Sequence, residues 1–188
     1  MMRRHEFISS ESSRWTDDDR IESGATTGSR LDLLTSKDND EAEFRIVRNR
    51  ALGLLARREH SVQELLRKLR SKGGAESICL VVVAELTRLD LQSDDRFAEV
   101  YTYSRASKGF GPLRIRQDLR QRGIDDATVE DHLTFDAGYW MEIAERARHK
   151  RFKGAVPETG NGWNTQARFL AQRGFPSDLI YRVLGEQL

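Results

Sequence analysis

The chain has 188 residues, of which 38% are hydrophobic and 32% charged, with a formal net charge of +1. This length allows one compact domain or a row of small units. No segment reaches the roughly 18 apolar residues of a membrane-spanning helix, and no apolar stretch follows the basic start "MMRRHEFISSESS", which excludes a secretory signal. The single cysteine permits no internal disulfide, which is usual in a reducing compartment, so we expect a cytoplasmic protein.

The charge is unevenly distributed along the chain. Residues 1–43 hold 6 Lys/Arg against 11 Asp/Glu, whereas residues 44–188 hold 25 against 19. The first segment is rich in Ser, Thr, Asp and Glu and offers too little apolar surface to offset the entropy of ordering it. We therefore predict a disordered acidic leader over 1–43. The basic body that follows is a pattern often linked to an anionic partner.

The pattern becomes helical after the leader. Apolar residues recur at steps of three and four over about 43–59, which predicts a first helix. Ser61 and Glu64 form a capping box that begins a second helix, with the hydroxyl accepting from the Glu64 amide and the carboxylate reaching back to the Ser61 amide. Gly73 ends that helix. The apolar run "AESICLVVVAELTRL" predicts a buried third helix with Cys79 in the core.

One motif recurs at intervals of about 50 residues. It reads "LRSKGG", "LRQRGI" and "LAQRGF": a leucine is followed four positions later by glycine, with Lys or Arg just before the glycine. Apolar residues stand six and ten positions after each glycine, on one face of a following helix. The three copies span Leu69–Gly73, Leu119–Gly123 and Leu170–Gly174. Such a period indicates tandem structural repeats.

The predicted fold is all-α, with three tandem three-helix repeats in an elongated, curved array. Such arrays expose long surfaces that suit long partners. The leading helices of the three repeats are expected at about 43–59, 94–107 and 137–152. The predicted units are the leader 1–43, repeat 1 over 44–92, repeat 2 over 93–136 and repeat 3 over 137–188.

The loop "KGFGP" resembles a phosphate-binding loop only superficially. It lacks the ending Gly-Lys-Ser/Thr, and it does not form Gly-x-Gly-x-x-Gly after a strand. Proline is favoured at the first position of a helix, where its missing N–H costs nothing. We therefore predict that Gly109 ends one helix and that Gly111 and Pro112 begin the next.

No constellation in the sequence indicates catalysis. The four histidines are scattered, and neither a His-Glu-x-x-His motif nor a cysteine pair is present. The acidic pairs Asp94-Asp95 and Asp125-Asp126 stand at predicted helix starts, where they favour the positive end of the helix dipole. We expect no enzyme activity, no catalytic residue, no metal and no cofactor.

Basic residues recur on the second helix of successive repeats and at the ends of the leading helices. One interpretation is an ordinary solvated face. The other is a continuous electropositive surface for a phosphate backbone or an acidic protein groove. The candidate partner-binding residues are Arg57, Arg58, Arg67, Lys68, Arg105, Lys108, Arg114, Arg116, Arg120, Arg122 and Arg173.

Three stretches, "ALGLLARREHSVQELLRKL", "DDRFAEVYTYSRASKGFGPLRIRQDLRQRGI" and "RFLAQRGF", resemble the RecX family of bacterial recombination regulators. The resemblance covers about residues 44–188. It implies three tandem three-helix repeats and a cytoplasmic protein that binds the RecA recombinase filament on DNA, in its helical groove. It also implies modulation of RecA, usually negative, that affects strand exchange, ATP hydrolysis and co-protease activity in DNA repair and the SOS response. Where the family often has "GYLDD" this chain has "LDLQSDD", and Ser93 is still expected to cap the helix.

Two other functions fit the same residues. A plain DNA-binding helical protein would act through phosphate contacts and would bind DNA tightly, with steep salt dependence and no recombinase. A helical scaffold would serve a different acidic partner. In the preferred reading the chain is a monomer with at most weak direct DNA contact and no membrane association.

Overall fold

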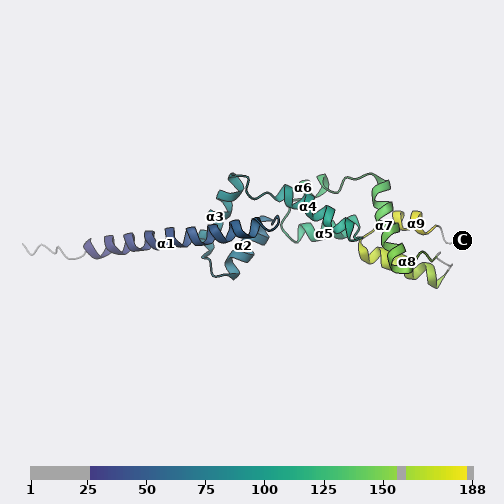
Figure 1. Cartoon of the computed structure of the whole chain (residues 1–188), viewed down its shortest axis with the longest axis horizontal. Helices are drawn as coiled ribbons and strands as arrows, with labels where there is room; N and C mark the ends of the chain where they lie inside the picture. The colour runs from purple at the N-terminus through teal and green to yellow at the C-terminus, as the bar shows by residue number, and fades with distance from the viewer. Residues whose placement is uncertain (1–25, 156–159, 186–188) are drawn as a thin grey trace, which may run out of the picture. The chain divides into compact units, whose positions relative to one another are not determined.

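The computed structural model describes residues 26–155 and 160–185, and the side chains of these residues apart from 26–36 and 137. The chain divides into two units, residues 1–38 and 39–188. The described residues form nine helices and no strand (Figure 1). The helices are α1 (Thr26–Leu55), α2 (Val62–Ser71), α3 (Glu76–Arg88), α4 (Asp94–Ser107), α5 (Pro112–Arg120), α6 (Asp126–Asp131), α7 (Ala137–Phe152), α8 (Asn161–Arg173) and α9 (Ser177–Leu184).

The prediction of an all-α chain with three three-helix repeats is confirmed. Helices α4 and α7 coincide with two of the predicted leading helices. Helix α1 differs, because it begins at Thr26 inside the predicted leader and ends at Leu55, before residue 59. The leader's predicted disorder over residues 1–25 falls outside the described residues. Residues 26–43 belong to the same helix as Val47 and Ala51, which pack in the core of repeat 1. Composition alone therefore placed the start of this helix too late.

Two hydrophobic cores support residues 39–188. Repeat 1 has its own core, whereas repeats 2 and 3 share one continuous core that joins helices α4 to α9. The core of repeat 1 consists of Val47, Ala51, Leu65, Leu69, Cys79, Val82, Val83 and Leu86. Cys79 therefore fills the core as expected, and burial raises the pKa of its thiol. The contact between repeats 1 and 2 must depend on something other than a shared apolar core.

The repeated motif ends a right-handed helix with a glycine in the left-handed backbone conformation. Gly73, Gly123 and Gly174 have φ values of 85°, 79° and 89°, a region that glycine adopts without penalty. In each copy the N–H after the glycine donates to the carbonyl of the motif leucine, at 3.2 to 3.3 Å, which is the bond that closes such a helix end. All three leucines are buried, and so are the apolar residues six and ten positions after each glycine.

These helix ends join the repeats. At the end of α8, the carbonyl of Arg173 accepts from the N–H of Gly111 at 2.8 Å, and that of Gly174 accepts from Leu113 at 3.0 Å. At the end of α5, the carbonyl of Arg122 accepts from the Ser61 hydroxyl at 2.8 Å. The second helices thus meet end to end, C-terminus against N-terminus, which pairs the unsatisfied carbonyls of one helix with donors at the start of the next.

These joints also settle the role of the loop "KGFGP". Gly109 has φ 79° and ends α4, while Gly111 is the N-cap of α5 and Pro112 its first residue. The prediction of helix punctuation is confirmed. Gly111 donates its N–H to a carbonyl of the next repeat, and a side chain at this position would lie 2.5 Å from the Gly174 carbonyl oxygen. The loop is a helix joint, and its glycine permits close backbone approach.

The joints predict a graded cost for glycine-to-alanine changes in the same motif. Gly73→Ala introduces only left-handed strain, about 1 to 2 kcal/mol, because nothing lies within 4 Å of the added Cβ. Gly123→Ala meets the end of the flexible Gln63 side chain, and Gly174→Ala meets the backbone nitrogen of Arg114 at 2.4 Å. Urea denaturation should rank the losses as Gly174 above Gly123 above Gly73. Equal losses for all three would contradict the joint at Gly174.

Candidate partner-binding surface

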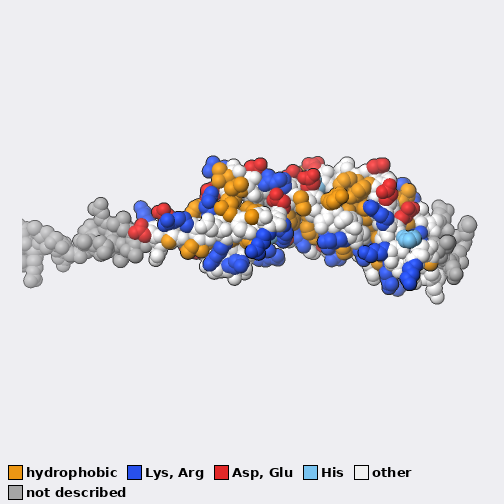
Figure 2. Space-filling view, viewed as in Figure 1, with side chains coloured by type: hydrophobic (Ala, Val, Ile, Leu, Met, Phe, Trp, Pro, Cys, Tyr) orange, Lys and Arg blue, Asp and Glu red, His pale blue; other side chains and the backbone are white. Residues whose placement is uncertain are grey.

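The predicted basic residues lie on or beside the stacked second helices. Figure 2 shows Lys and Arg side chains gathered over the parts of the view where Figure 1 draws α2, α5 and α8. Their surroundings divide them into three groups: cations that hold a joint, cations in exposed surface pairs, and cations without an ion-pair partner among the described residues.

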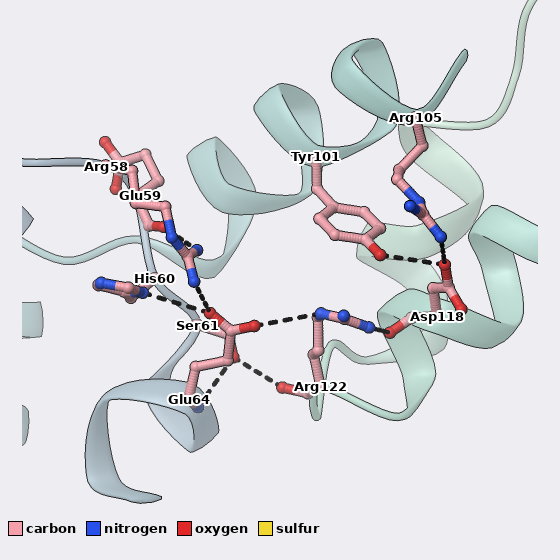
Figure 3. Close-up of polar contacts among 9 residues, drawn as sticks. All are labelled: Arg58, Glu59, His60, Ser61, Glu64, Tyr101, Arg105, Asp118 and Arg122. Carbon is pink, nitrogen blue, oxygen red and sulfur yellow. Dashed lines mark hydrogen bonds and ion pairs between the residues drawn. The ribbon is translucent and has the colours of Figure 1, made fainter. Parts of the chain in front are cut away.

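Arg122 holds the joint between repeats 1 and 2 (Figure 3). Its Nε donates to Glu64 Oε1 at 3.1 Å, and a terminal nitrogen donates to the Asp118 carbonyl at 2.6 Å. The guanidinium also lies over the Tyr101 ring, 4.6 Å from its centroid. These contacts tie α2 to α4 and α5. Because the side chain is engaged on several sides, Arg122 stabilises the structure and is poorly placed to meet a partner.

Glu64 is the acidic centre of this joint. Its carboxylate also accepts from Arg58 at 3.0 Å and lies 3.2 Å from His60 Nδ1. Burial opposes ionisation of Glu64, but the hydrogen bonds from His60 and Arg58 and the nearby positive charges outweigh it, so the pKa of Glu64 lies below its ordinary value. Burial lowers the pKa of His60 and so favours the neutral ring, although the hydrogen bond with Glu64 acts in the opposite direction.

Asp118 organises a second cluster on α5. It accepts from the Tyr101 hydroxyl at 3.0 Å, from Arg105 at 2.8 Å and from Arg114 at 3.2 Å. Burial opposes ionisation here as well, but the hydrogen bonds from Arg105 and Tyr101 outweigh it, so the pKa of Asp118 lies below its ordinary value. Arg105 is therefore held within repeat 2, whereas Arg114 is exposed to solvent although it donates to Asp118.

Arg173 holds the joint between repeats 2 and 3. Its guanidinium donates to the Lys108 carbonyl at 2.9 Å and lies 4.8 Å from the centroid of Phe110 and 5.2 Å from that of Phe169. Arg122 and Arg173 occupy the same position of the repeated motif. The basic residue before the motif glycine thus serves both inter-repeat joints in the same way.

Arg116 and Arg120 form exposed pairs with α6. Arg116 donates two bonds of 2.8 Å to Glu130, and Arg120 donates to Asp126 at 2.6 Å. Surface pairs of this kind contribute about 0 to 1 kcal/mol, so an anionic partner can exchange for the acidic residue at little cost. These two arginines remain available for binding.

Apart from Arg173, which bonds to backbone carbonyls only, four of the predicted residues have no ion pair among the described residues: Arg57, Arg67, Lys68 and Lys108. Arg57 follows the end of α1, and Arg67 and Lys68 lie on α2. Arg67 also lines a polar hollow of about 200 Å³ together with Gln63, Glu64, Gln121 and Arg122. This places unpaired positive charge directly beside the joint between repeats 1 and 2.

Sequence reasoning missed the acidic side chains and backbone carbonyls that accept hydrogen bonds from these cations. The hydroxyl half of the predicted capping box is present, with the Glu64 amide donating to Ser61 at 3.1 Å. In place of the predicted hydrogen bond from the Ser61 N–H, the Glu64 carboxylate accepts hydrogen bonds from Arg58 and Arg122. Asp94, expected only to start a helix, also accepts from the Val62 N–H at 2.8 Å across the joint. No local spacing could reveal these contacts between repeats.

The described residues hold no cluster of three or more His, Cys, Asp or Glu that could bind a metal ion. Within the same residues, no helix is long and apolar enough to cross a membrane.

The fold and the surface define a class of protein: a tandem repeat of three-helix units whose stacked second helices present cations. Three family models match the chain, described as the first, second and third three-helix domains of RecX, over residues 48–86, 93–133 and 138–184. The chain belongs to the RecX family, whose matched members are named as regulatory proteins and not as enzymes.

Curated relatives and solved structures agree with this assignment. Regulatory protein RecX of Pseudomonas savastanoi pv. phaseolicola is 39% identical over 138 residues, 73% of this chain and 89% of that protein. The one from Stenotrophomonas maltophilia is 41% identical over 134 residues, 71% and 82% of the two chains. A crystal structure of RecX from Lactobacillus salivarius aligns with a TM-score of 0.65 at 26% identity, covering 77% of this chain and 96% of that one.

The joint between repeats 1 and 2 predicts a two-step loss of stability in acid. Below about pH 6.5, His60 of the unfolded chain gains a proton that the buried ring resists. Below about pH 4.5, the Glu64 carboxylate of the unfolded chain gains a proton, whereas in the folded joint it stays ionised to lower pH. In both ranges the unfolded state binds more protons, so the free energy of unfolding falls as the pH falls.

Urea denaturation between pH 8 and pH 4 measures this dependence. A matched series on Glu64→Gln should lose the part of the decline that lies below about pH 4.5. An unfolding free energy that stays constant from pH 7 to pH 4 would contradict the account.

Proposed function

We propose that the chain regulates the RecA recombinase by binding its filament on DNA and inhibiting recombinase, ATPase and co-protease activity. It acts by occupying the filament groove and not by catalysis. Membership of the RecX family of regulatory proteins supports this assignment. We further propose that it acts in the cytoplasm, where such filaments form, and that it does so as a monomer.

The observation that carries the proposal is the unpaired charge beside the first joint. Arg57, Arg67 and Lys68 have no ion pair among the described residues. Cations held on a rigid helix attract an anionic surface without first breaking an internal pair. The exposed pairs of Arg116 and Arg120 extend this surface along α5.

The joint residues take no part in this proposed contact. Arg122 and Arg173 were candidates from the sequence, but their guanidinium groups are bonded within the chain and packed on aromatic rings. We assign to them the positioning of the second helices. The binding residues proposed are therefore Arg57, Arg67, Lys68, Lys108, Arg116 and Arg120, with Arg58 and Arg114 at the margin.

Direct DNA binding is the second candidate, favoured by the same cations. It differs in its dependence on salt, because each neutralised phosphate releases counterions and steepens the decline of affinity with salt. A gel-shift series with single-stranded DNA and no recombinase separates the two. Weak binding that is seen only below physiological salt supports a protein partner, whereas tight binding that persists at physiological salt supports the DNA-binding alternative.

Removing two unpaired cations should weaken regulation without unfolding the chain. In a titration of recombinase ATPase on single-stranded DNA, Arg57→Gln combined with Arg67→Gln should require roughly tenfold more protein for half inhibition. Both side chains are exposed, so thermal unfolding should stay within a few degrees of the unmodified chain.

A matched control tests whether position matters and not charge alone. Arg88 and Arg182 are also exposed and without an ion pair in the described structure, but they lie on third helices. Arg88→Gln combined with Arg182→Gln removes the same charge and should inhibit like the unmodified chain. Equal weakening by both double variants would contradict the assignment to the surface beside the first joint. No inhibition by the unmodified chain would contradict the function.

A further inference from the structure

A hollow of a different character lies on repeat 2. It has a volume of about 480 Å³ and is lined by Glu99, Val100, Thr102, Tyr103, Ser104, His132 and Phe135. These residues come from α4, from the end of α6 and from the segment before α7. In Figure 2, hydrophobic side chains gather between the places where Figure 1 draws α6 and α7, below the segment that joins the two helices.

The apolar residues of this hollow are unusually accessible. Tyr103 is 72% exposed and Val100 53%, and Phe135 stacks on Tyr139 with centroids 4.5 Å apart. On the opposite side of the same helix, Phe97 and Ala106 are buried in the core. Helix α4 therefore has apolar residues on two sides, and the fold covers only one. A contiguous exposed apolar group of this kind is typical of an interaction site.

The charge at the rim of the hollow indicates what kind of partner it fits. Glu99 and Asp95 stand one turn apart on α4, where like charges disfavour the helix. Asp95 is paired with His132 at 2.7 Å, but Glu99 has no ion pair among the described residues. No Lys or Arg lines the hollow. This environment repels phosphate and attracts a cation, which is the reverse of the surface on α2 and α5.

We propose that this hollow binds a protein segment in which an apolar side chain stands beside a Lys or Arg. The apolar side chain packs between Val100, Tyr103 and Phe135, and the cation pairs with Glu99. Resting on the proposed function, the segment belongs to a recombinase subunit of the filament. The chain then has two unlike contacts: a basic one on α2 and α5, and an apolar one with an acidic rim on α4.

The test measures binding of the full chain to recombinase filaments assembled on single-stranded DNA with a slowly hydrolysed ATP analogue, by cosedimentation. Tyr103→Ala and Val100→Ser should each weaken binding by about tenfold, since exposed anchors at an interface often contribute this much. Both changes are at exposed positions, so circular dichroism melting should be unchanged. Glu99→Gln should also weaken binding and make it less sensitive to salt.

The matched control is Val81→Ser, at a valine of α3 that is 59% exposed and lies outside the hollow. It should bind as the unmodified chain does. If the unmodified chain binds filaments and the Tyr103 and Val100 variants bind equally well, the hollow is not a contact and the proposed function still stands. If the unmodified chain does not bind, both proposals are overturned. Self-association of the unmodified chain that Tyr103→Ala abolishes would identify a second copy as the occupant and overturn the recombinase contact.

Discussion

The structure depends on one constraint: α5 and α8 must each end in a glycine with left-handed backbone angles, so that their last carbonyls can meet the start of the neighbouring second helix. Gly123 and Gly174 meet this constraint, with φ values of 79° and 89°. The carbonyls of the residues just before them accept from Ser61 and Gly111. A helix C-terminus against a helix N-terminus also aligns the two dipoles favourably. The end-to-end arrangement thus follows from the chemistry of helix ends and sets where the basic side chains of α2 and α5 lie.

The two joints use this constraint in different settings. Repeats 2 and 3 also share a hydrophobic core, whereas repeats 1 and 2 have separate cores and meet through Glu64, Arg122 and Asp94. At the open end, the Lys72 carbonyl accepts from Arg50 of the same repeat, so this helix end is satisfied without a neighbour. Terminal repeats of tandem arrays commonly carry such polar ends. The cations left over from these tasks form the surface proposed to meet a partner.

Much of the fold could be predicted because its signals are local and repeated. The motif leucines and glycines, the bounds of α4 and α7 and the helix start at Pro112 follow from periodicity and capping chemistry. The role of each arginine could not be predicted, because Arg122 and Arg67 look alike in the sequence. The partners of Arg122, Glu64 and Tyr101, stand 58 and 21 residues away, and only folding brings them together. The apolar hollow could not be predicted either, because folding brings His132 and Phe135 beside residues of α4.

Hydrogen–deuterium exchange on the full chain, with and without recombinase filaments on single-stranded DNA, tests the central claim most directly. The account predicts slower exchange in α2 and α4 when filaments are present, because these helices carry the proposed contacts. It also predicts unchanged exchange in α9, which contributes no proposed contact. Protection confined to α8 and α9, or equal protection by single-stranded DNA alone, would contradict the proposed mode of regulation.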